Sequence, residues 1–126
     1  MENILHVGLD VGSTTVKIIV MDDNKNTIYK DYQRHFSDTK NTVCNVLENL
    51  LKMYPSNSFT LALTGSGAMS AAKFLGVDFI QEVVSCKRAV EKYIPKTDVV
   101  IELGGEDAKI IYFDQSIEQR MNGTCA

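Results

Sequence analysis

The order of the predicted elements indicates an α/β fold built on a mixed sheet. Three apolar strands joined by short turns open the chain, helical segments follow, and the strand pattern starts again near residue 98. Consecutive strands with short connections form an antiparallel meander, and amphipathic helices between strands cover a sheet face. We therefore expect a mixed sheet with an antiparallel meander and covering helices, followed by the first strands of a second copy.

The opening meander has three strands rich in β-branched and aromatic residues, which favour strands. They are predicted at residues 4–10, 15–21 and 27–36. The first connection contains Gly12, and the second is the polar run Asp-Asp-Asn-Lys-Asn at 22–26, whose residue types favour turns.

Helical periodicity begins after Ser37 and Asp38, both suitable N-caps. Apolar residues then recur at spacings of three and four until Pro55 ends the pattern, namely Val43, Val46, Leu47, Leu50, Leu51 and Tyr54. The next elements are a strand at 59–64, a turn at 65–67, a short helix at 68–75 ended by Gly76, and a helix at 83–94.

The opening pattern is repeated at the end of the chain, where strands are predicted at 99–103, 108–113 and 117–121. The repeat stops at Ala126, before any covering helices. We expect a first subdomain at 1–96 and a truncated second subdomain at 97–126, so that the chain is part of a longer protein. An uncovered apolar sheet face would then favour self-association.

Composition excludes several classes of protein. The 126 residues carry a net charge of −3 without a basic block, which argues against an extended nucleic-acid interface. No apolar run reaches the roughly 20 residues needed to span a bilayer, and no signal peptide is recognisable. Three cysteines without CxxC spacing fit a reducing compartment. We expect a cytoplasmic protein with neither nucleic-acid nor membrane partners.

The turn after the first strand has the residue types of a phosphate-binding loop. Gly12 lets backbone N–H groups approach phosphate oxygens, and the following hydroxyls add donors. The predicted cofactor-binding residues are Gly12, Ser13, Thr14, Thr15 and Lys17. Lys17 either reaches the phosphates or lies on the outer face. Asp10 would repel phosphate, so it is predicted to hold Mg²⁺ directly or through water; a hairpin turn with a capping Asp is the alternative.

A second glycine turn occupies the same place in the repeat. Gly104 and Gly105 again permit close approach to phosphate, and Glu102 takes the position of Asp10 as a magnesium-side acid. Glu106 is predicted to orient or deprotonate water during phosphoryl transfer, with a solvated turn acid as the alternative. The two turns together predict a clamp around a phosphate chain.

Three segments, 10–17, 102–109 and the terminal Met-Asn-Gly-Thr-Cys-Ala at 121–126, resemble the ATPase activators of 2-hydroxyacyl-CoA dehydratases. These belong to the BadF/BadG/BcrA/BcrD ATPase family, in the superfamily of acetate kinase, sugar kinases, heat-shock chaperones and actin. The resemblance covers essentially the whole chain and implies a ribonuclease H-like, actin-type ATPase domain. The glycine turns indicate the superfamily, and the terminal segment narrows it to the family.

The resemblance also implies a function. Members of this family are homodimers that share one four-iron four-sulfur cluster, with two cysteines from each subunit, and Cys125 matches the first of these. ATP and magnesium would drive a low-potential electron, supplied by a ferredoxin or flavodoxin, from the cluster into the dehydratase. The second cysteine would lie beyond Ala126, so this chain alone should not assemble the normal cluster. We also expect weak or absent ATPase activity, because the adenine-binding half of the cleft would come from the missing second domain.

The chain departs from the family pattern at one position, and several other residues have only structural interpretations. Some relatives carry Asp where this chain has Glu102, and Glu82 lies in a family-like segment, at 81–86, but is interpreted only as a first-turn helix acid. Alternative functions are a BadF-type sugar kinase without a cluster and a non-enzymatic dimerising module. Among the other reactive residues, Cys44 and Cys86 are predicted to be buried and structural, and His6 and His35 are not expected to bind metal.

Overall fold

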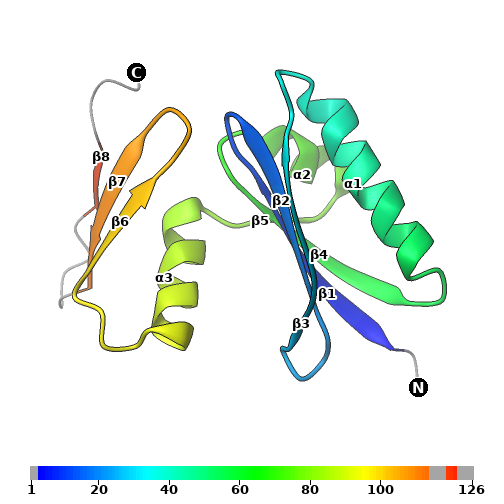
Figure 1. Cartoon of the computed structure of the whole chain (residues 1–126), viewed down its shortest axis with the longest axis horizontal. Helices are drawn as coiled ribbons and strands as arrows, with labels where there is room; N and C mark the ends of the chain where they lie inside the picture. Colours follow the sequence, from blue (N-terminus) through cyan, green and yellow to red (C-terminus); the bar gives the residue numbers. More distant parts are fainter. Residues whose placement is uncertain (1–2, 114–118, 122–126) are drawn as a thin grey trace. The chain divides into compact units, whose positions relative to one another are not determined.

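The computed structural model describes residues 3–113 and the backbone of residues 119–121. The chain divides into two compact units, Met1–Ile80 and Gln81–Ala126. Each unit contains its own β-sheet (Figure 1). None of the helices in the described residues is long and apolar enough to cross a membrane.

The sheet of the first unit has five strands in the order β3-β2-β1-β4-β5. Their bounds are β1 Ile4–Val11, β2 Thr15–Met21, β3 Thr27–Arg34, β4 Ser58–Thr64 and β5 Asp78–Phe79. The first three form the predicted antiparallel meander, whereas β4 is parallel to β1 and β5 is parallel to β4. The mixed sheet is therefore confirmed. The two-residue β5 was not predicted, because so short a strand has no periodicity.

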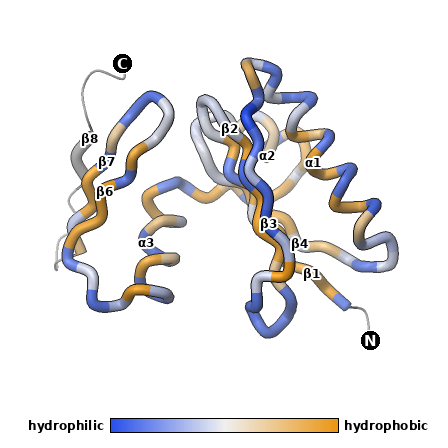
Figure 2. Tube along the Cα trace, in the orientation of Figure 1, coloured by the Kyte–Doolittle hydropathy of each residue, from blue (hydrophilic) through white to orange (hydrophobic). Residues whose placement is uncertain are grey.

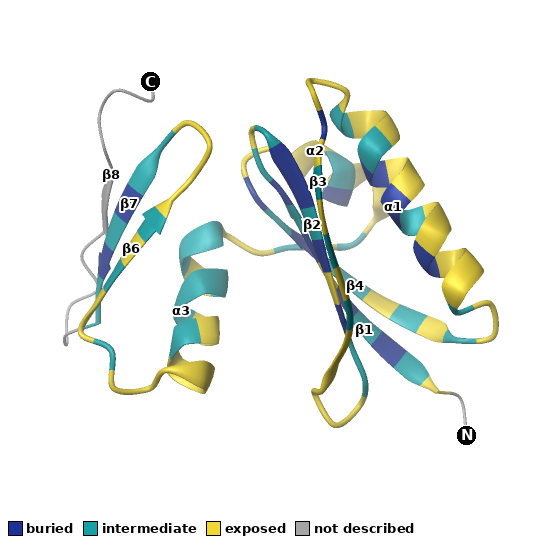
Figure 3. Cartoon of the chain, viewed as in Figure 1, coloured by how far each residue is buried: buried dark blue, intermediate teal, exposed yellow. Residues whose placement is uncertain are grey.

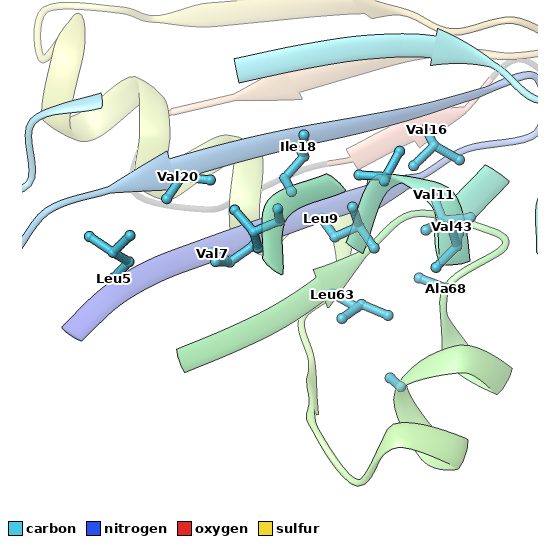
Figure 4. Close-up of a cluster of buried hydrophobic side chains, with 13 residues drawn as sticks. Leu5, Val7, Leu9, Val11, Val16, Ile18, Val20, Val43, Leu63 and Ala68 are labelled. Carbon is cyan, nitrogen blue, oxygen red and sulfur yellow. The ribbon is translucent and has the colours of Figure 1, made fainter. Parts of the chain in front are cut away.

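Two helices cover one face of this sheet, α1 (Thr39–Met53) and α2 (Met69–Leu75). Asp38 caps α1 by accepting a hydrogen bond from the Asn41 N–H, and Gly76 ends α2 with a left-handed φ of 66°. The alternate residues of β1 that face these helices form the centre of the core (Figure 4). The buried core residues are Leu5, Val7, Leu9, Val11, Val16, Ile18, Val20, Val43, Val46, Leu50, Leu63, Ala68 and Ala72.

The second unit consists of α3 (Glu82–Tyr93) and an antiparallel sheet in the order β6-β7-β8. The strands are β6 Val99–Leu103, β7 Ala108–Tyr112 and β8 Gln119–Met121. In the structure, α3 belongs to the same compact unit as this sheet. The sequence analysis expected the helix to belong to a first subdomain at 1–96, and that boundary stays a prediction. Residues 117 and 118 of the last predicted strand lie outside the described residues.

One face of the β6–β7 sheet is apolar and open, as predicted. Val99, Ile101 and Leu103 alternate along β6 and are all exposed, with Leu103 at 79% (Figures 2 and 3). The opposite face differs from the prediction, since Lys109 and Ile111 of β7 are buried there and Lys109 contacts α3. The second sheet therefore has a helix on one side.

The two described cysteines do not behave alike. Cys44 on α1 is exposed, so the prediction that it is buried was wrong, whereas Cys86 on α3 is half-buried. Cys44 follows the buried Val43 by one position, and one residue turns a helix by about 100°, which carries the thiol away from the core face.

Candidate functional site

The first glycine turn closes tightly between β1 and β2. The Gly12 N–H donates to the Thr15 carbonyl across 2.8 Å, and Val11 is paired with Val16 just before it. Ser13 is exposed and Thr14 half-buried. Within the described residues, no partner is found for the N–H groups of Ser13 and Thr14. These two donors are therefore available for an anion, as the sequence predicted for this turn.

Asp10 and Lys17 lie directly opposite each other on β1 and β2, on the sheet face turned away from α1. The Lys17 Nζ contacts Asp10 Oδ2 at 2.9 Å and lies 5.8 Å from the centre of the Tyr32 ring. The ammonium is thus paired with a carboxylate in this structure. The second oxygen of Asp10, Oδ1, is buried and accepts no hydrogen bond within the described residues.

A third glycine turn lies beside the first one, and sequence reasoning had treated it only as a connection. Because β4 is parallel to β1, with Thr64 opposite Asp10, the turn Gly65–Gly67 starts where β1 ends. The Gly67 N–H donates to the Val11 carbonyl at 2.8 Å. Parallel strands place their carboxyl ends at one sheet edge, where ligands bind in α/β folds. Recognising that pairing would have identified this turn.

Gly65 is required in this turn for two reasons. Its φ of 103° lies in the region that favours glycine. A Cβ atom there would also lie 2.3 Å from the Val11 carbonyl oxygen and 2.6 Å from Asp10 Oδ1. The close approach of this backbone fixes the end of β1 and one side of the Asp10 carboxylate.

The second glycine turn has the same backbone geometry as the first. The Gly104 N–H donates to the Asp107 carbonyl across 2.8 Å, as Gly12 does to Thr15. Glu102 is paired with Lys109 in the register that pairs Asp10 with Lys17. Gly104, Gly105 and Glu106 are all exposed at the tip of the hairpin. The repeat inferred from the sequence therefore extends to individual hydrogen bonds.

Lys109 is the centre of an ion-pair cluster that was not predicted. Its Nζ lies 2.8 Å from Glu82, 3.1 Å from Asp107 and 3.6 Å from Glu102, and its side chain is only 6% exposed. Burial alone would lower the pKa of Lys109, but the hydrogen bonds with Glu82 and Asp107 and the nearby Glu102 raise it far above its usual value. Glu82 is thus an ion-pair partner. The register shared with Lys17 was the signal that could have revealed the cluster.

The cluster also affects the thiol beside it. Burial raises the pKa of Cys86, and the charge of Glu102 raises it further, while Lys109 acts in the opposite direction. A raised thiol pKa reduces the thiolate fraction at neutral pH, so Cys86 has the character of an unreactive structural cysteine.

The predicted site residues fall into two groups, one in each unit. Asp10, the turn 12–15 and Lys17 come together in the first unit, and Glu102 and the turn 104–106 in the second. Cys125 lies outside the described residues. Among the residues that the structure describes, no group of three or more His, Cys, Asp or Glu residues is arranged to hold a metal ion.

Both histidines make hydrogen bonds within the first unit, and the expectation that neither binds metal stays a prediction. His6 contacts the Thr60 hydroxyl at 2.8 Å and Asp23 at 3.0 Å. His35 contacts the Gly12 carbonyl and the backbone of Ser37.

The mixed sheet and the repeated glycine turns are those of a protein with an actin-like ATPase fold. Solved structures agree. The activator of 2-hydroxyisocaproyl-CoA dehydratase from Clostridium difficile with bound ADPNP superimposes with a TM-score of 0.76 at 23% identity, covering 94% of this chain and 45% of that one. Component A of (R)-2-hydroxyglutaryl-CoA dehydratase from Acidaminococcus fermentans gives 0.75 at 26% identity, covering 98% and 49%.

The chain belongs to the BadF/BadG/BcrA/BcrD ATPase family, whose profile matches residues 7–126. The (R)-2-hydroxyglutaryl-CoA dehydratase activating ATPase of Acidaminococcus fermentans is 32% identical over 130 residues, covering 98% of this chain and 49% of the relative. The resemblance stated from the sequence is therefore confirmed. The chain spans about half the length of the curated relatives that it matches.

Proposed function

We propose that this chain is a nucleotide-binding part of an ATP-dependent activator of a 2-hydroxyacyl-CoA dehydratase. The observation that carries the proposal is the hydrogen bond from Gly12 to Thr15 and its exact counterpart from Gly104 to Asp107, in a member of an ATPase family. Two relatives are named as dehydratase activators, and a solved activator was obtained with bound ADPNP. ATP is therefore the proposed ligand.

Each hairpin supplies groups suited to phosphate. In the first, the N–H groups of Ser13 and Thr14 and the side-chain hydroxyls of the turn are the proposed donors. In the second, the exposed backbone at Gly104 and Gly105 takes that role, with Glu106 as the carboxylate that orients the attacking water. The clamp formed by both hairpins around one phosphate chain stays a prediction.

Asp10 fits the proposed magnesium ion better than Glu102 does. Its Oδ1 is buried and has no hydrogen-bond donor among the described residues, an arrangement that a cation would satisfy. Mg²⁺ usually takes one or two carboxylates and completes its shell with water and phosphate oxygens, so a full protein cage is unnecessary. Glu102 already lies 3.6 Å from the Lys109 ammonium, so any role toward magnesium competes with that pair. The ion would neutralise phosphate charge.

Electron transfer is the second half of the proposal. By the family resemblance, Cys125 would hold a four-iron four-sulfur cluster shared by two copies of the complete protein. A ferredoxin or flavodoxin would supply the electron, and the dehydratase would receive it. Support for this half comes from the terminal sequence at 121–126 and from the names of the relatives.

The test uses the protein encoded by the complete gene. Anaerobic iron reconstitution should give a cluster spectrum, and Cys125→Ser should abolish it while Cys44→Ser, at an exposed position of α1, leaves it intact. Asp10→Asn should remove magnesium-dependent ATP hydrolysis, whereas Asp23→Asn, beside His6, should not. Hydrolysis that depends on a sugar, with phosphate transferred to it and no cluster formed, would show a kinase instead.

A further inference from the structure

We propose that His35 is a positioning residue for the first glycine turn, holding the Gly12 peptide so that the next two amides face the phosphate chain of the nucleotide. The inference rests on the proposed function and extends it to a residue outside the glycine motif. His35 follows the end of β3, far from Gly12 in the sequence, and is only 6% exposed.

Hydrogen bonds indicate the tautomer of the His35 ring, that is, which of its two nitrogens carries the proton. The Ser37 N–H donates to Nδ1 at 3.1 Å, and the Thr39 hydroxyl lies 3.4 Å from the same nitrogen. An N–H group donates only to a nitrogen without a proton, so the neutral ring carries its proton on Nε2. That Nε2–H donates to the Gly12 carbonyl at 3.1 Å.

The backbone of His35 joins the same turn. Its N–H donates to the Thr14 carbonyl at 3.1 Å, so His35 contacts both ends of the Gly12–Thr14 segment. The Gly12 N–H is bonded to Thr15. The N–H and the carbonyl of Gly12 are thus both hydrogen-bonded within the protein. In a trans peptide the Ser13 N–H points away from the Gly12 carbonyl that His35 binds. Within the described residues, neither the Ser13 nor the Thr14 N–H has a partner, so both are the proposed donors to the nucleotide.

The segment after His35 has the strain expected near a functional site. Phe36 and Ser37 are consecutive non-glycine residues with left-handed φ angles of 46° and 68°. Such conformations are costly and persist where surrounding contacts impose them. Here the Ser37 N–H donates to the His35 ring, so one imidazole contacts both this bend and the Gly12 turn.

Two conservative variants separate these contacts. In His35→Gln the amide reaches the position of Nε2 and restores the donor to Gly12, whereas in His35→Asn the amide oxygen takes the position of Nδ1 and keeps only the bond from Ser37. We expect His35→Asn to weaken ADPNP binding to the complete protein about threefold to tenfold, the value of one lost hydrogen bond. His35→Gln keeps the donor to Gly12 and should bind ADPNP more tightly than His35→Asn does, and the control His6→Gln should bind it as the wild type does. Equal affinities of the Gln and Asn variants at position 35 would overturn the proposal.

A second measurement on the 126-residue chain keeps this inference separate from the proposed function. Nitrogen NMR shifts of the His35 ring should show a protonated Nε2, and the Gly12 amide should exchange faster in His35→Asn than in His35→Gln. A proton on Nδ1 in the neutral ring would refute the positioning role. If the complete protein binds no ADPNP while both NMR results are as expected, the proposed function fails and the positioning of the turn stands.

Discussion

The two glycine hairpins share a backbone and differ in what holds it. In the first, neutral hydrogen bonds from Gly67 to Val11 and from His35 to Gly12 fix the turn, and Lys17 is 41% exposed. In the second, a 6% exposed Lys109 joins three carboxylates. One turn geometry can therefore be maintained by backbone contacts or by charge. The two hairpins should respond differently to substitution and pH.

The largest effect is expected at the backbone contact of the first hairpin. Gly65→Ala combines a left-handed φ with a Cβ 2.3 Å from the Val11 oxygen and should destabilise the first unit by about 4 kcal/mol. Gly76→Ala is the matched control, because its φ is also positive but its Cβ meets open space, so about 1 kcal/mol is expected. Urea unfolding followed by circular dichroism measures both, and equal losses would show that the close approach is unimportant.

Removing the charged centre of the second hairpin comes next. Lys109→Met leaves three carboxylates facing one another in a largely covered site and should destabilise the second unit by about 3 kcal/mol. Lys17→Met removes a half-exposed pair and should cost less than about 1 kcal/mol. Amide exchange of β7 and β2 reports the two units separately. A larger loss from Lys17→Met would reverse the comparison.

The pH dependence should also distinguish the hairpins. Because its partners raise the pKa of Lys109 above the ordinary value of 10.5, the stability it contributes is complete below that value and is lost as the pH rises through the raised pKa. The difference in unfolding free energy between the wild type and Lys109→Met should be constant from neutral pH to about 10 and shrink above it. A difference that already falls between pH 7 and 9 would contradict the assignment.

The smallest difference is expected between the two turn glycines. A Cβ at Gly104 would lie 2.5 Å from Asp107 Oδ1, so Gly104→Ala should displace this flexible side chain from Lys109 and destabilise the second unit by about 1 kcal/mol. At Gly12 the nearest atom would be 3.5 Å away, an ordinary contact, so Gly12→Ala should leave thermal stability nearly unchanged. Differential scanning calorimetry of the two variants tests this, and identical shifts would mean that Asp107 does not matter.

Local patterns predicted most of the fold because they reflect local physics. The helix stripe with Val43 and Val46, the left-handed Gly76 and the strand at 99–103 all depend on residues close in sequence, and the structure has them. The parallel pairing of β4 with β1 depends on the route of the chain around α1, which periodicity does not encode. The turn at 65–67 was predicted, but its place beside Val11 and Asp10 was missed for that reason.

The candidate site shows the same division. Both glycine turns were predicted from the sequence because glycine, hydroxyl and acidic residues that lie next to one another are enough to indicate a phosphate-binding turn. Lys109 was missed because it lies in an apolar strand and meets Glu82 only when α3 packs on the sheet. His35 was missed because its proposed role comes from a ring contact with Gly12, 23 residues away in the sequence, and a single histidine has no spacing to reveal such a contact.

The hydrogen bond between Gly67 and Val11 has a consequence for the order of folding. It joins residues separated by the whole α1 crossover, whereas the bond between Gly104 and Asp107 closes within four residues. Contacts across long loops form late because loop closure has an entropic cost. We therefore expect the first hairpin to reach its final shape only after β4 docks, and pulse-labelled amides should become protected at Gly67 later than at Gly104. The hairpin that is held by contacts from distant parts of the chain would then be the last to reach its final shape.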